Sequence, residues 1–337
     1  MAGANQLHVR PPSGRRPSGD LLPRVSSDGA DAAVAALFGR SGPPVQVRRR
    51  VLKESTGRPV VQYRYTTVDG AAASRATVVS KGYYRGDGAA TFAAMEQLWS
   101  AGFGEDAHLT ISQPLAYLSA PRLLLQTMAA GPSLYRFIDD PPTGARAVRM
   151  TGRWLAKLHN TALAAGPLLD RSREAAKLET FRDALVVTCP SYSARIGGLS
   201  ERVALHHEVT DAPLVPTHGD FQPKNVHVSR GRVTVIDFDR FAVAEPVRDV
   251  GHFVAQSMTM SYVRTGSFAA IEEWNRTFLE AYGSSAPPHA LVGLAVATVR
   301  SMLEILYYKL VVRPVRDPSF LAAWLDECDR CLSAQTP

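Results

Sequence analysis

Three strand-like runs, in which apolar and β-branched residues recur between polar ones, follow the start of the chain. They cover residues 45–53, 60–68 and 75–83. The connections between them are short and carry turn-forming residues, Gly-Arg-Pro at 57–59 and Asp-Gly at 69–70. Strands joined so closely pair antiparallel, because a parallel crossover needs about a dozen residues or more. The pattern therefore predicts a small antiparallel meander.

The apolar spacing then changes to a helical one in residues 89–101. Phe92, Met95, Leu98 and Trp99 recur at intervals of three and four, which places them along one face of a helix. A single helix is therefore predicted to follow the third strand.

The pattern of the chain changes again near residue 130. Two more strands are predicted at residues 115–119 and 122–127, before Ala-Ala-Gly-Pro at 129–132 interrupts all regular spacing. Beyond this break the pattern is mainly helical, most clearly in residues 145–163 and 291–310. The break is therefore the predicted boundary between a strand-rich first part and a helical second part.

One stretch of the second part departs from the helical pattern. Residues 226–228 and 233–238 are rich in β-branched residues and flank Ser-Arg-Gly at 229–231. This arrangement predicts a β-hairpin within the helical part of the chain.

The composition is that of a folded, globular protein. Of the 337 residues, 45% are hydrophobic and 20% charged, and this length is typical of two lobes rather than one core. Residues 1–30 are rich in Pro, Gly, Ser and Arg, and their apolar residues show neither helical nor strand spacing. They are therefore predicted to form a flexible tail. No apolar run approaches the roughly 18 to 20 residues of a membrane-spanning helix, so no membrane partner is expected.

The excess of basic residues, 38 Lys and Arg against 31 Asp and Glu, gives a net charge of +7. Much of it lies in the opening segment, between Arg10 and Arg64. A basic RNA-binding protein would need this charge on one face. We find no zinc-finger spacing and no aromatic RNA-binding motif, so no nucleic-acid partner is expected.

The three cysteines also exclude some classes of protein. Cys328 and Cys331 have the spacing of half a zinc or redox site, but they lie in a helical pattern without a second ligand pair nearby. We interpret them as ordinary helix positions. The odd number of cysteines and the lack of a charged and apolar leader favour a cytoplasmic location.

Residues with catalytic potential gather around the predicted hairpin, in the run THGDFQPKNVHVSRGRVTVIDFD. Asp220, Asn225 and Asp237 lie at a tight loop and at a strand end of this run. Phosphoryl transfer needs such groups, because a carboxylate must meet the acceptor hydroxyl and hard oxygen ligands must hold magnesium. The alternative is a polar surface turn capped by Asp220. The joint spacing of the three residues favours the catalytic interpretation.

The run His218-Gly219-Asp220, with Asn225 five positions after the aspartate and then Ile-Asp-Phe at 236–238, resembles the catalytic core of the aminoglycoside phosphotransferase and choline kinase family. The resemblance implies an α+β, two-lobed, protein-kinase-like fold with a small antiparallel-sheet lobe and a larger, mainly helical lobe. It also implies that Asp220 orients or deprotonates the acceptor, that Asn225 and Asp237 bind Mg²⁺, and that His218 braces the loop.

The family places a lysine on the third strand and a glutamate on the following helix, where the pair positions the phosphates of ATP or GTP. Lys81 and Glu96 stand in this order in the chain. Residues 122–128 resemble the connection against which the nucleotide base stacks. The resemblance implies that backbone groups near Gln126 and Met128 read the edge of the base.

Two further aspartates follow Asp237 in the chain. Asp239 stands where protein kinases have glycine, and three roles are open for it: support of the metal site, contact with a cationic substrate, or an ordinary strand end. Asp249 stands where the family often has a carboxylate that supports the catalytic loop, with a helix cap as the alternative. No Ala-Pro-Glu segment or long activation loop follows, which argues against a protein substrate.

The resemblance thus predicts a tail (1–30), a nucleotide-binding lobe (31–128) and a catalytic and substrate-binding lobe (129–337). The expected partners are a nucleoside triphosphate and a small hydroxyl-bearing substrate. The expected reaction is transfer of the γ-phosphate of ATP or GTP to an antibiotic-like acceptor, with a role in antibiotic resistance. The alternatives are a metabolite kinase of the choline, sugar or homoserine type, and a pseudokinase. The pseudokinase is disfavoured because the lysine, the base and both metal positions are present.

Overall fold

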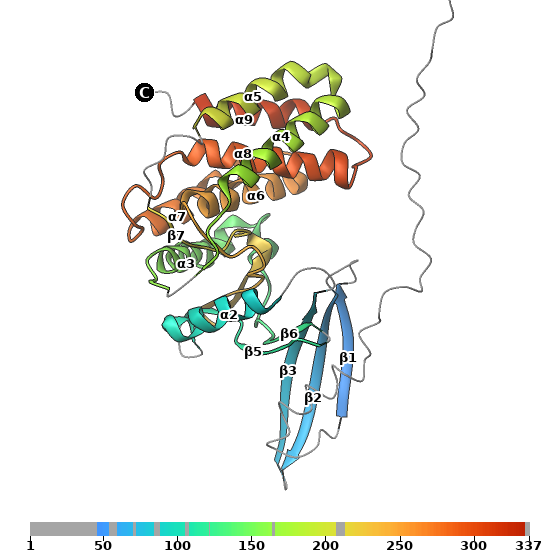
Figure 1. The fold of residues 1–337 in the computed structure, drawn as a ribbon, viewed down its shortest axis with the longest axis vertical. Helices are drawn as coiled ribbons and strands as arrows, with labels where there is room; N and C mark the ends of the chain where they lie inside the picture. The colour runs from blue at the N-terminus through green and yellow to red at the C-terminus, as the bar shows by residue number, and fades with distance from the viewer. Residues whose placement is uncertain are drawn as a thin grey trace, which may run out of the picture.

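The computed structural model describes residues 46–53, 59–69, 72–83, 88–104, 108–120, 122–163, 166–206 and 213–333. The predicted tail at residues 1–30 lies outside these residues. In the part of the chain that is described, a small strand-rich lobe lies beside a larger helical lobe (Figure 1). The division of the chain at residues 128 and 129 stays a prediction.

The small lobe is built on a five-stranded antiparallel sheet. Its spatial order is β1-β2-β3-β6-β5, so the three strands of the predicted meander lie side by side. The two later strands complete the sheet next to β3. The strands are β1 (Gln46–Lys53), β2 (Val60–Asp69), β3 (Ala72–Gly82), β5 (Pro114–Leu118) and β6 (Leu123–Thr127). All five predicted strands are therefore confirmed, with small shifts at their ends.

The single helix of this lobe is α2 (Gly88–Leu98), which passes into a π-helical turn (Trp99–Phe103). The regular helix ends before the predicted residue 101, because Gly102 has a left-handed φ of 100°. The buried face of α2, with Met95 and Leu98, packs against β5 and β6.

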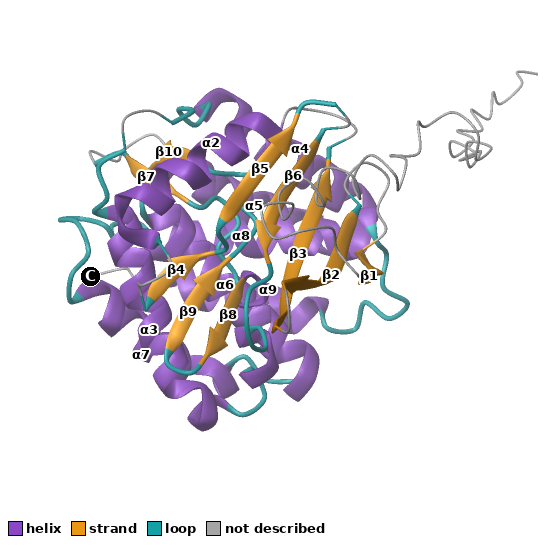
Figure 2. Cartoon of the chain, turned by 90° about the horizontal axis from the view of Figure 1, so that it is seen from below, coloured by secondary structure: helices purple, strands orange, loops and turns teal. Residues whose placement is uncertain are grey.

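Two small sheets lie in the region of the predicted hairpin (Figure 2). The hairpin itself is formed by β8 (Val226–Ser229) and β9 (Arg232–Val235), and β4 (Leu109–Ile111) joins it parallel to β9. The predicted second strand of the hairpin reached residue 238, which is wrong. It ends earlier because Asp237 has a φ of 73°, a left-handed conformation that a strand excludes.

A second pair of strands frames the same region. It consists of β7 (Val215–Thr217) and β10 (Ala242–Ala244), which pair antiparallel. The catalytic run therefore begins at the end of one short strand and ends at the start of its partner.

The large lobe is mainly helical, as the pattern predicts. Helix α3 packs against α7, α6 against α8, and α4 against both α5 and α8. The helices are α3 (Pro141–His159), α4 (Arg171–Thr188), α5 (Ser193–His206), α6 (Val247–Thr265), α7 (Glu272–Gly283), α8 (Leu294–Tyr307) and α9 (Leu321–Ser333). Helix α9 carries Cys328 and Cys331 as free cysteines. Within the described ranges, no helix combines the length and the apolar character needed to cross a membrane.

The main hydrophobic core joins the two lobes around Trp154 of α3. The Trp154 ring lies 5.3 Å from that of Phe103 and 5.5 Å from that of Phe221, measured between centroids. Its indole N–H donates to the carbonyl of Thr110 at 2.9 Å, so the buried polar atom is satisfied. This core fixes the catalytic run against both lobes.

Candidate active site

Two buried phenylalanines anchor the catalytic run. Phe221 follows Asp220 and Phe238 follows Asp237, and both phenylalanine side chains are almost completely buried. Both pack on Trp154, with ring centroids 5.5 and 6.4 Å away. Burial of such a side chain contributes about 1.5–3 kcal/mol. The two aspartates are therefore held in place by their apolar neighbours in the sequence.

Asp249 holds the backbone of the loop that begins at His218. Its carboxylate accepts the N–H groups of His218 at 2.6 Å and Gly219 at 2.8 Å. The carboxylate is buried, and it also lies 3.3 Å from the ring nitrogen Nε2 of His159. Burial alone would raise the pKa of Asp249, but the hydrogen bonds and the neighbouring histidines lower it. Asp249 thus accepts hydrogen bonds from the backbone of the loop. Such a contact fits the loop-supporting role that the resemblance implies for it.

His218 joins the two halves of the catalytic run. Its Nδ1 accepts the N–H of Asp220 at 3.2 Å, and its Nε2 donates to the carbonyl of Ile236 at 2.9 Å. Its ring packs on Phe238, 4.7 Å between centroids. Both ring nitrogens of His218 are therefore engaged with the backbone of the run, which fits the bracing role that the resemblance implies.

The carboxylate of Asp220 is held by three side chains. Oδ1 accepts from Gln222 at 2.9 Å and from Nε2 of His252 at 3.1 Å, and Oδ2 accepts from Asn225 at 3.2 Å. Burial would raise the pKa of Asp220, but the hydrogen bond and charge of His252, together with the charge of Arg240, lower it to about 2. The carboxylate is therefore ionised at neutral pH and able to accept a hydrogen bond from a hydroxyl.

His252 is a residue of this site that the sequence reasoning missed. It lies on α6 three positions after Asp249, so both side chains project from the same face of the helix. That spacing is the one signal in the sequence that could have linked His252 to the catalytic loop.

Asn225 and Asp237 lie next to each other at the base of the hairpin. The N–H of Ile236, the residue before Asp237, donates to the carbonyl of Asn225 at 3.0 Å. The side-chain nitrogen of Asn225 donates to the carbonyl of Asp220 at 3.0 Å, which leaves Oδ1 as its ligand atom. An amide oxygen and a carboxylate are the hard ligands that Mg²⁺ prefers, so this pair fits the ion. The left-handed φ of Asp237 is typical of strained functional positions.

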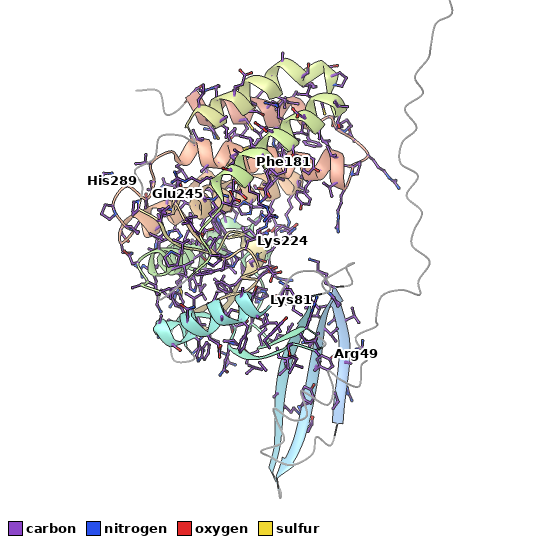
Figure 3. The ribbon with its side chains drawn as sticks, in the orientation of Figure 1. Arg49, Lys81, Phe181, Lys224, Glu245 and His289 are labelled. Atoms are coloured by element: carbon purple, nitrogen blue, oxygen red, sulfur yellow. The ribbon has the colours of Figure 1, made fainter. Side chains whose placement is uncertain are left out.

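Lys81 contacts the two aspartates of the Asp-Phe-Asp run. Its Nζ lies 2.6 Å from Oδ1 of Asp237 and 2.8 Å from Oδ2 of Asp239. The hydroxyl of Tyr83 donates to Oδ1 of Asp239 at 2.6 Å. Burial, followed by the charge of Asp239, raises the pKa of Tyr83, which keeps it a donor. Figure 3 places Lys81 on the edge of the small lobe that faces the large lobe.

The glutamate expected to pair with Lys81 lies apart from it. Glu96 is exposed on α2, and none of the ion pairs found in the described residues joins it to Lys81. The structure thus brings Lys81, Asp237 and Asp239 together and leaves Glu96 outside the cluster.

Gln126 and Met128 lie at the end of β6, beside the strand that carries Lys81. Gln126 is buried and pairs with Val79 of β3, and the N–H of Met128 donates to the carbonyl of Thr77 at 3.4 Å. The side chain of Met128 is 43% exposed. The N–H of Met128 is thus paired with Thr77, and reading of the nucleotide base by backbone groups near Gln126 and Met128 stays a prediction.

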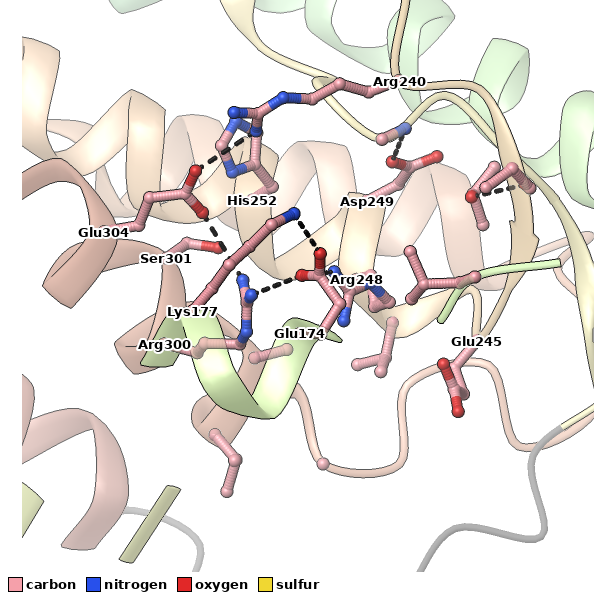
Figure 4. A pocket seen from close by; sticks show the side chains of 18 of the residues that line it. Glu174, Lys177, Arg240, Glu245, Arg248, Asp249, His252, Arg300, Ser301 and Glu304 are labelled. Carbon is pink, nitrogen blue, oxygen red and sulfur yellow. Dashed lines mark hydrogen bonds and ion pairs between the residues drawn. The ribbon is translucent and has the colours of Figure 1, made fainter. Parts of the chain in front are cut away.

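A cavity of about 670 Å³ opens beside the catalytic loop. Helices α4, α6 and α8 line it with charged residues, and Gly219 and Arg240 border it from the loop side (Figure 4). His252 lines the cavity and also contacts Oδ1 of Asp220 at 3.1 Å, so the cavity lies one side chain away from the carboxylate. Its volume is typical of small-molecule sites, which span about 300–1,000 Å³.

The sequence of residues 62–292, more than half of the chain, matches the phosphotransferase enzyme family. A search of curated proteins gave no match.

Solved structures of kinases share the fold at low sequence identity. A choline/ethanolamine kinase family protein from Mesorhizobium loti is 16% identical, covers 92% of this chain and 95% of its own, and has a TM-score of 0.55. A thermostable mutant of an aminoglycoside phosphotransferase, in ternary complex with ADP and hygromycin B, is 19% identical over 90% of this chain and 98% of its own, with a TM-score of 0.58. Glucosamine kinase in complex with glucosamine, ADP and inorganic phosphate is 20% identical over 94% of this chain and 84% of its own, with a TM-score of 0.53. These likenesses confirm the predicted two-lobed, kinase-like fold.

Proposed function

The chain belongs to the phosphotransferase enzyme family, and from that premise we propose that it moves the γ-phosphoryl group of ATP to a small molecule bound beside Asp220. It is an ATP-dependent phosphotransferase with an alcohol group as acceptor. The observation that carries the proposal is the convergence of Asp220, Asn225, Asp237 and Lys81 at the junction of the lobes.

In the proposed reaction the acceptor hydroxyl binds at Asp220. The carboxylate accepts the hydrogen bond of the hydroxyl and then its proton, while the oxygen forms a bond to the γ-phosphorus. The bond between the γ-phosphorus and the bridging oxygen breaks, and ADP leaves with the electron pair. His252, Gln222 and Asn225 hold the carboxylate in position through their hydrogen bonds.

The negatively charged phosphates of ATP need cations near them, on the side of the site that faces the small lobe. Mg²⁺, held by Asn225 and Asp237, would neutralise charge on the β- and γ-phosphates. Lys81 supplies a protein cation near the same place. Of the three roles open for Asp239, its contacts with Lys81 and Tyr83 favour support of the metal and phosphate site. GTP is the alternative donor.

The acceptor is proposed to be a small, antibiotic-like or metabolite hydroxyl compound. One structural neighbour binds hygromycin B and another binds glucosamine. The cavity beside Asp220 has the volume for a molecule of this size.

The test is ATP consumption with Mg²⁺ against aminoglycosides, nucleoside antibiotics, macrolides, choline and sugars. We expect acceptor-dependent ADP release by the wild-type protein and none above background by Asp237→Ala, because the substitution removes a proposed metal ligand. Asp183→Ala, which changes an exposed aspartate of α4, is the matched control and should keep the full rate. Equal rates for Asp237→Ala and the wild type would contradict the metal assignment.

A further inference from the structure

One carboxylate in the cavity is surrounded by three cations. Oε2 of Glu174 accepts from Nη2 of Arg248 at 2.6 Å and from Nη2 of Arg300 at 2.5 Å, and Oε1 accepts from Lys177. Figure 4 shows these side chains converging from α4, α6 and α8. Only 8% of the Glu174 side chain is exposed, so solvent screens the group weakly.

A second carboxylate does not offset this excess of positive charge. Glu304 lies 3.2 Å from Arg240 and 3.5 Å from Arg300. The charge of Arg240 also acts on Asp220, so four cations face three carboxylates, which leaves one positive charge in excess.

The other acidic residues that line the cavity are already engaged elsewhere. Glu245 is paired with Arg171, and Asp249 is buried against the loop N–H groups and His159. Neither is free to neutralise the cluster around Glu174. The histidine of the cavity, His252, is turned to Asp220 and adds no negative charge.

Two guanidinium nitrogens of this cluster lack a hydrogen-bond acceptor. Nη1 of Arg248 and Nε of Arg300 are buried and have no partner among the described residues. A guanidinium has five N–H donors, and Glu174 accepts from one nitrogen of each arginine. Burial, together with the charge of Arg248, lowers the pKa of Arg300, as expected of crowded like charges. A buried donor without an acceptor is unfavourable, so an anionic group that reached these two nitrogens would relieve this cost.

We propose that the acceptor of this enzyme carries, besides its hydroxyl, an anionic oxygen group, a carboxylate or a phosphate, that binds to Arg248, Arg300 and Lys177. This inference rests on the proposed function, because it assumes that the cavity beside Asp220 is the acceptor site. The hydroxyl then lies at the Asp220 end of the cavity and the anionic group at the Glu174 end. A polycationic acceptor would bring its ammonium groups against the excess positive charge and is disfavoured.

The competing explanation is that the cluster only ties α4, α6 and α8 together. Such a network would hold the fold but would show no preference for an anionic ligand. The two explanations therefore differ in binding, which can be measured without turnover.

The test uses four sugars with the same ring and different charge: glucose, glucosamine, glucuronate and glucose 6-phosphate. Each is titrated by calorimetry into full-length protein saturated with Mg²⁺ and AMP-PNP, so that the nucleotide phosphates already occupy their own site. We expect glucuronate or glucose 6-phosphate to bind at least about tenfold more tightly than glucose, and glucosamine to bind more weakly than glucose. The tighter of the two anions identifies the carboxylate or the phosphate as the preferred group.

Three variants complete the test. Lys177→Gln changes a half-exposed residue and should weaken binding of the anionic sugar about threefold or more, and Arg248→Gln should weaken it about tenfold. Arg276→Gln, on the exposed surface of α7, should change nothing. AMP-PNP affinity should be equal in all of them, which also shows that they are folded.

The outcomes separate the inference from the proposed function. Equal affinity for charged and neutral sugars, tighter binding of glucosamine, or an anion preference that survives both Lys177→Gln and Arg248→Gln would overturn the inference and leave the cluster a structural network. Absence of AMP-PNP binding to the wild-type protein would instead overturn the proposed function.

Discussion

Gly219 shows how a single residue without a side chain shapes the catalytic loop. Its φ is +76°, and a Cβ at this position would lie 2.1 Å from the carbonyl oxygen of Arg240. The related loop of protein kinases carries arginine here, but in this chain the backbone of Arg240 occupies the space. The glycine therefore allows the loop to pack directly against the segment that follows Asp237.

We predict that Gly219→Ala loses both stability and activity, because the added methyl group displaces the loop that carries Asp220. Gly266→Ala is the matched control: Gly266 has a similar φ of +73°, but nothing lies within 4 Å of an added Cβ. The control should cost about 1 kcal/mol of unfolding free energy from backbone strain alone and keep its kcat. Thermal unfolding and kcat, measured side by side, check this. Equal effects of the two substitutions would show that the contact with Arg240 is unimportant.

The pKa of Glu174 predicts how stability depends on pH. Burial would raise it, but the hydrogen bond from Lys177 and the charges of Arg248 and Arg300 lower it from 4.5 to about 2. A carboxyl group with a lowered pKa in the folded state stabilises the fold above its unfolded pKa, and this contribution is lost as the pH falls from about 4.5 toward 2.

We therefore predict a steeper loss of unfolding temperature between pH 4.5 and 2 for the wild type than for Glu174→Gln. At neutral pH the variant should be less stable by about 3–5 kcal/mol, since three cations lose their carboxylate. Unfolding followed by circular dichroism over this pH range provides the measurement. Parallel curves for the two proteins would contradict the assigned pKa.

The residues of the site differ in how far the sequence predicts them. Asp220, Asn225 and Asp237 lie within 18 consecutive residues on a loop and a hairpin, so local structure alone brings them together. The cluster of Lys177, Arg248 and Arg300 comes from three helices far apart in the chain. No local spacing signals it, because it depends on how the helices pack.

At the scale of elements, the orientation of α2 explains why Glu96 lies outside the site. Thr91, Met95 and Leu98 form the buried face of the helix. Glu96 follows Met95 directly and is turned roughly 100° away from it, toward solvent. The helix was predicted from its apolar spacing, but the direction of a residue at the margin of the stripe depends on packing. Tyr83 and Asp239 provide the contacts around Lys81 instead.

We predict that Tyr83→Phe raises the KM for ATP or lowers kcat by about tenfold, because Asp239 loses a hydrogen bond that orients it toward Lys81. Glu96→Gln, at the position where the family has its glutamate, should leave both constants unchanged. Steady-state kinetics at varied ATP concentration distinguish the two. A larger loss of kcat/KM for ATP in Glu96→Gln than in Tyr83→Phe would show that Glu96 does act at the nucleotide site.

The sequence predicted the elements in which several apolar residues recur at helical or strand spacing. Strands β4, β7 and β10 have three residues each and carry no measurable alternation, so they were missed. Apart from the hairpin and the loop before it, the stretch from residue 164 to 290 was predicted only as part of a mainly helical region, although it contains α4 to α7. The first buried residue of helix α4 is Glu174. A search for apolar residues at helical spacing does not detect it, because it is charged.

At the scale of the whole molecule, the two lobes are joined by a continuous core and a shared sheet. Strand β4, from the first third of the chain, pairs in parallel with β9 of the catalytic hairpin. Trp154 of α3 packs between Phe103 and the anchor residue Phe221. The position of the catalytic run therefore depends on both lobes, which a boundary drawn from sequence pattern alone does not show.

Asp220 is the proposed base of the transfer reaction. Its carboxylate is ionised, it contacts His252 of the cavity wall, and Asn225 contacts it at 3.2 Å. Asparagine at this position keeps the shape of the side chain but cannot accept a proton. General-base catalysis contributes about 10²- to 10⁴-fold to the rate.

The most direct measurement compares wild type, Asp220→Asn and the surface control Asp183→Asn. Binding of Mg²⁺ and AMP-PNP is titrated by calorimetry, and phosphorylated acceptor is followed by mass spectrometry with an acceptor identified in the panel. We predict equal nucleotide affinity in all three proteins and a rate of transfer that falls about 10²- to 10⁴-fold in Asp220→Asn alone. An unchanged rate in Asp220→Asn would contradict the account.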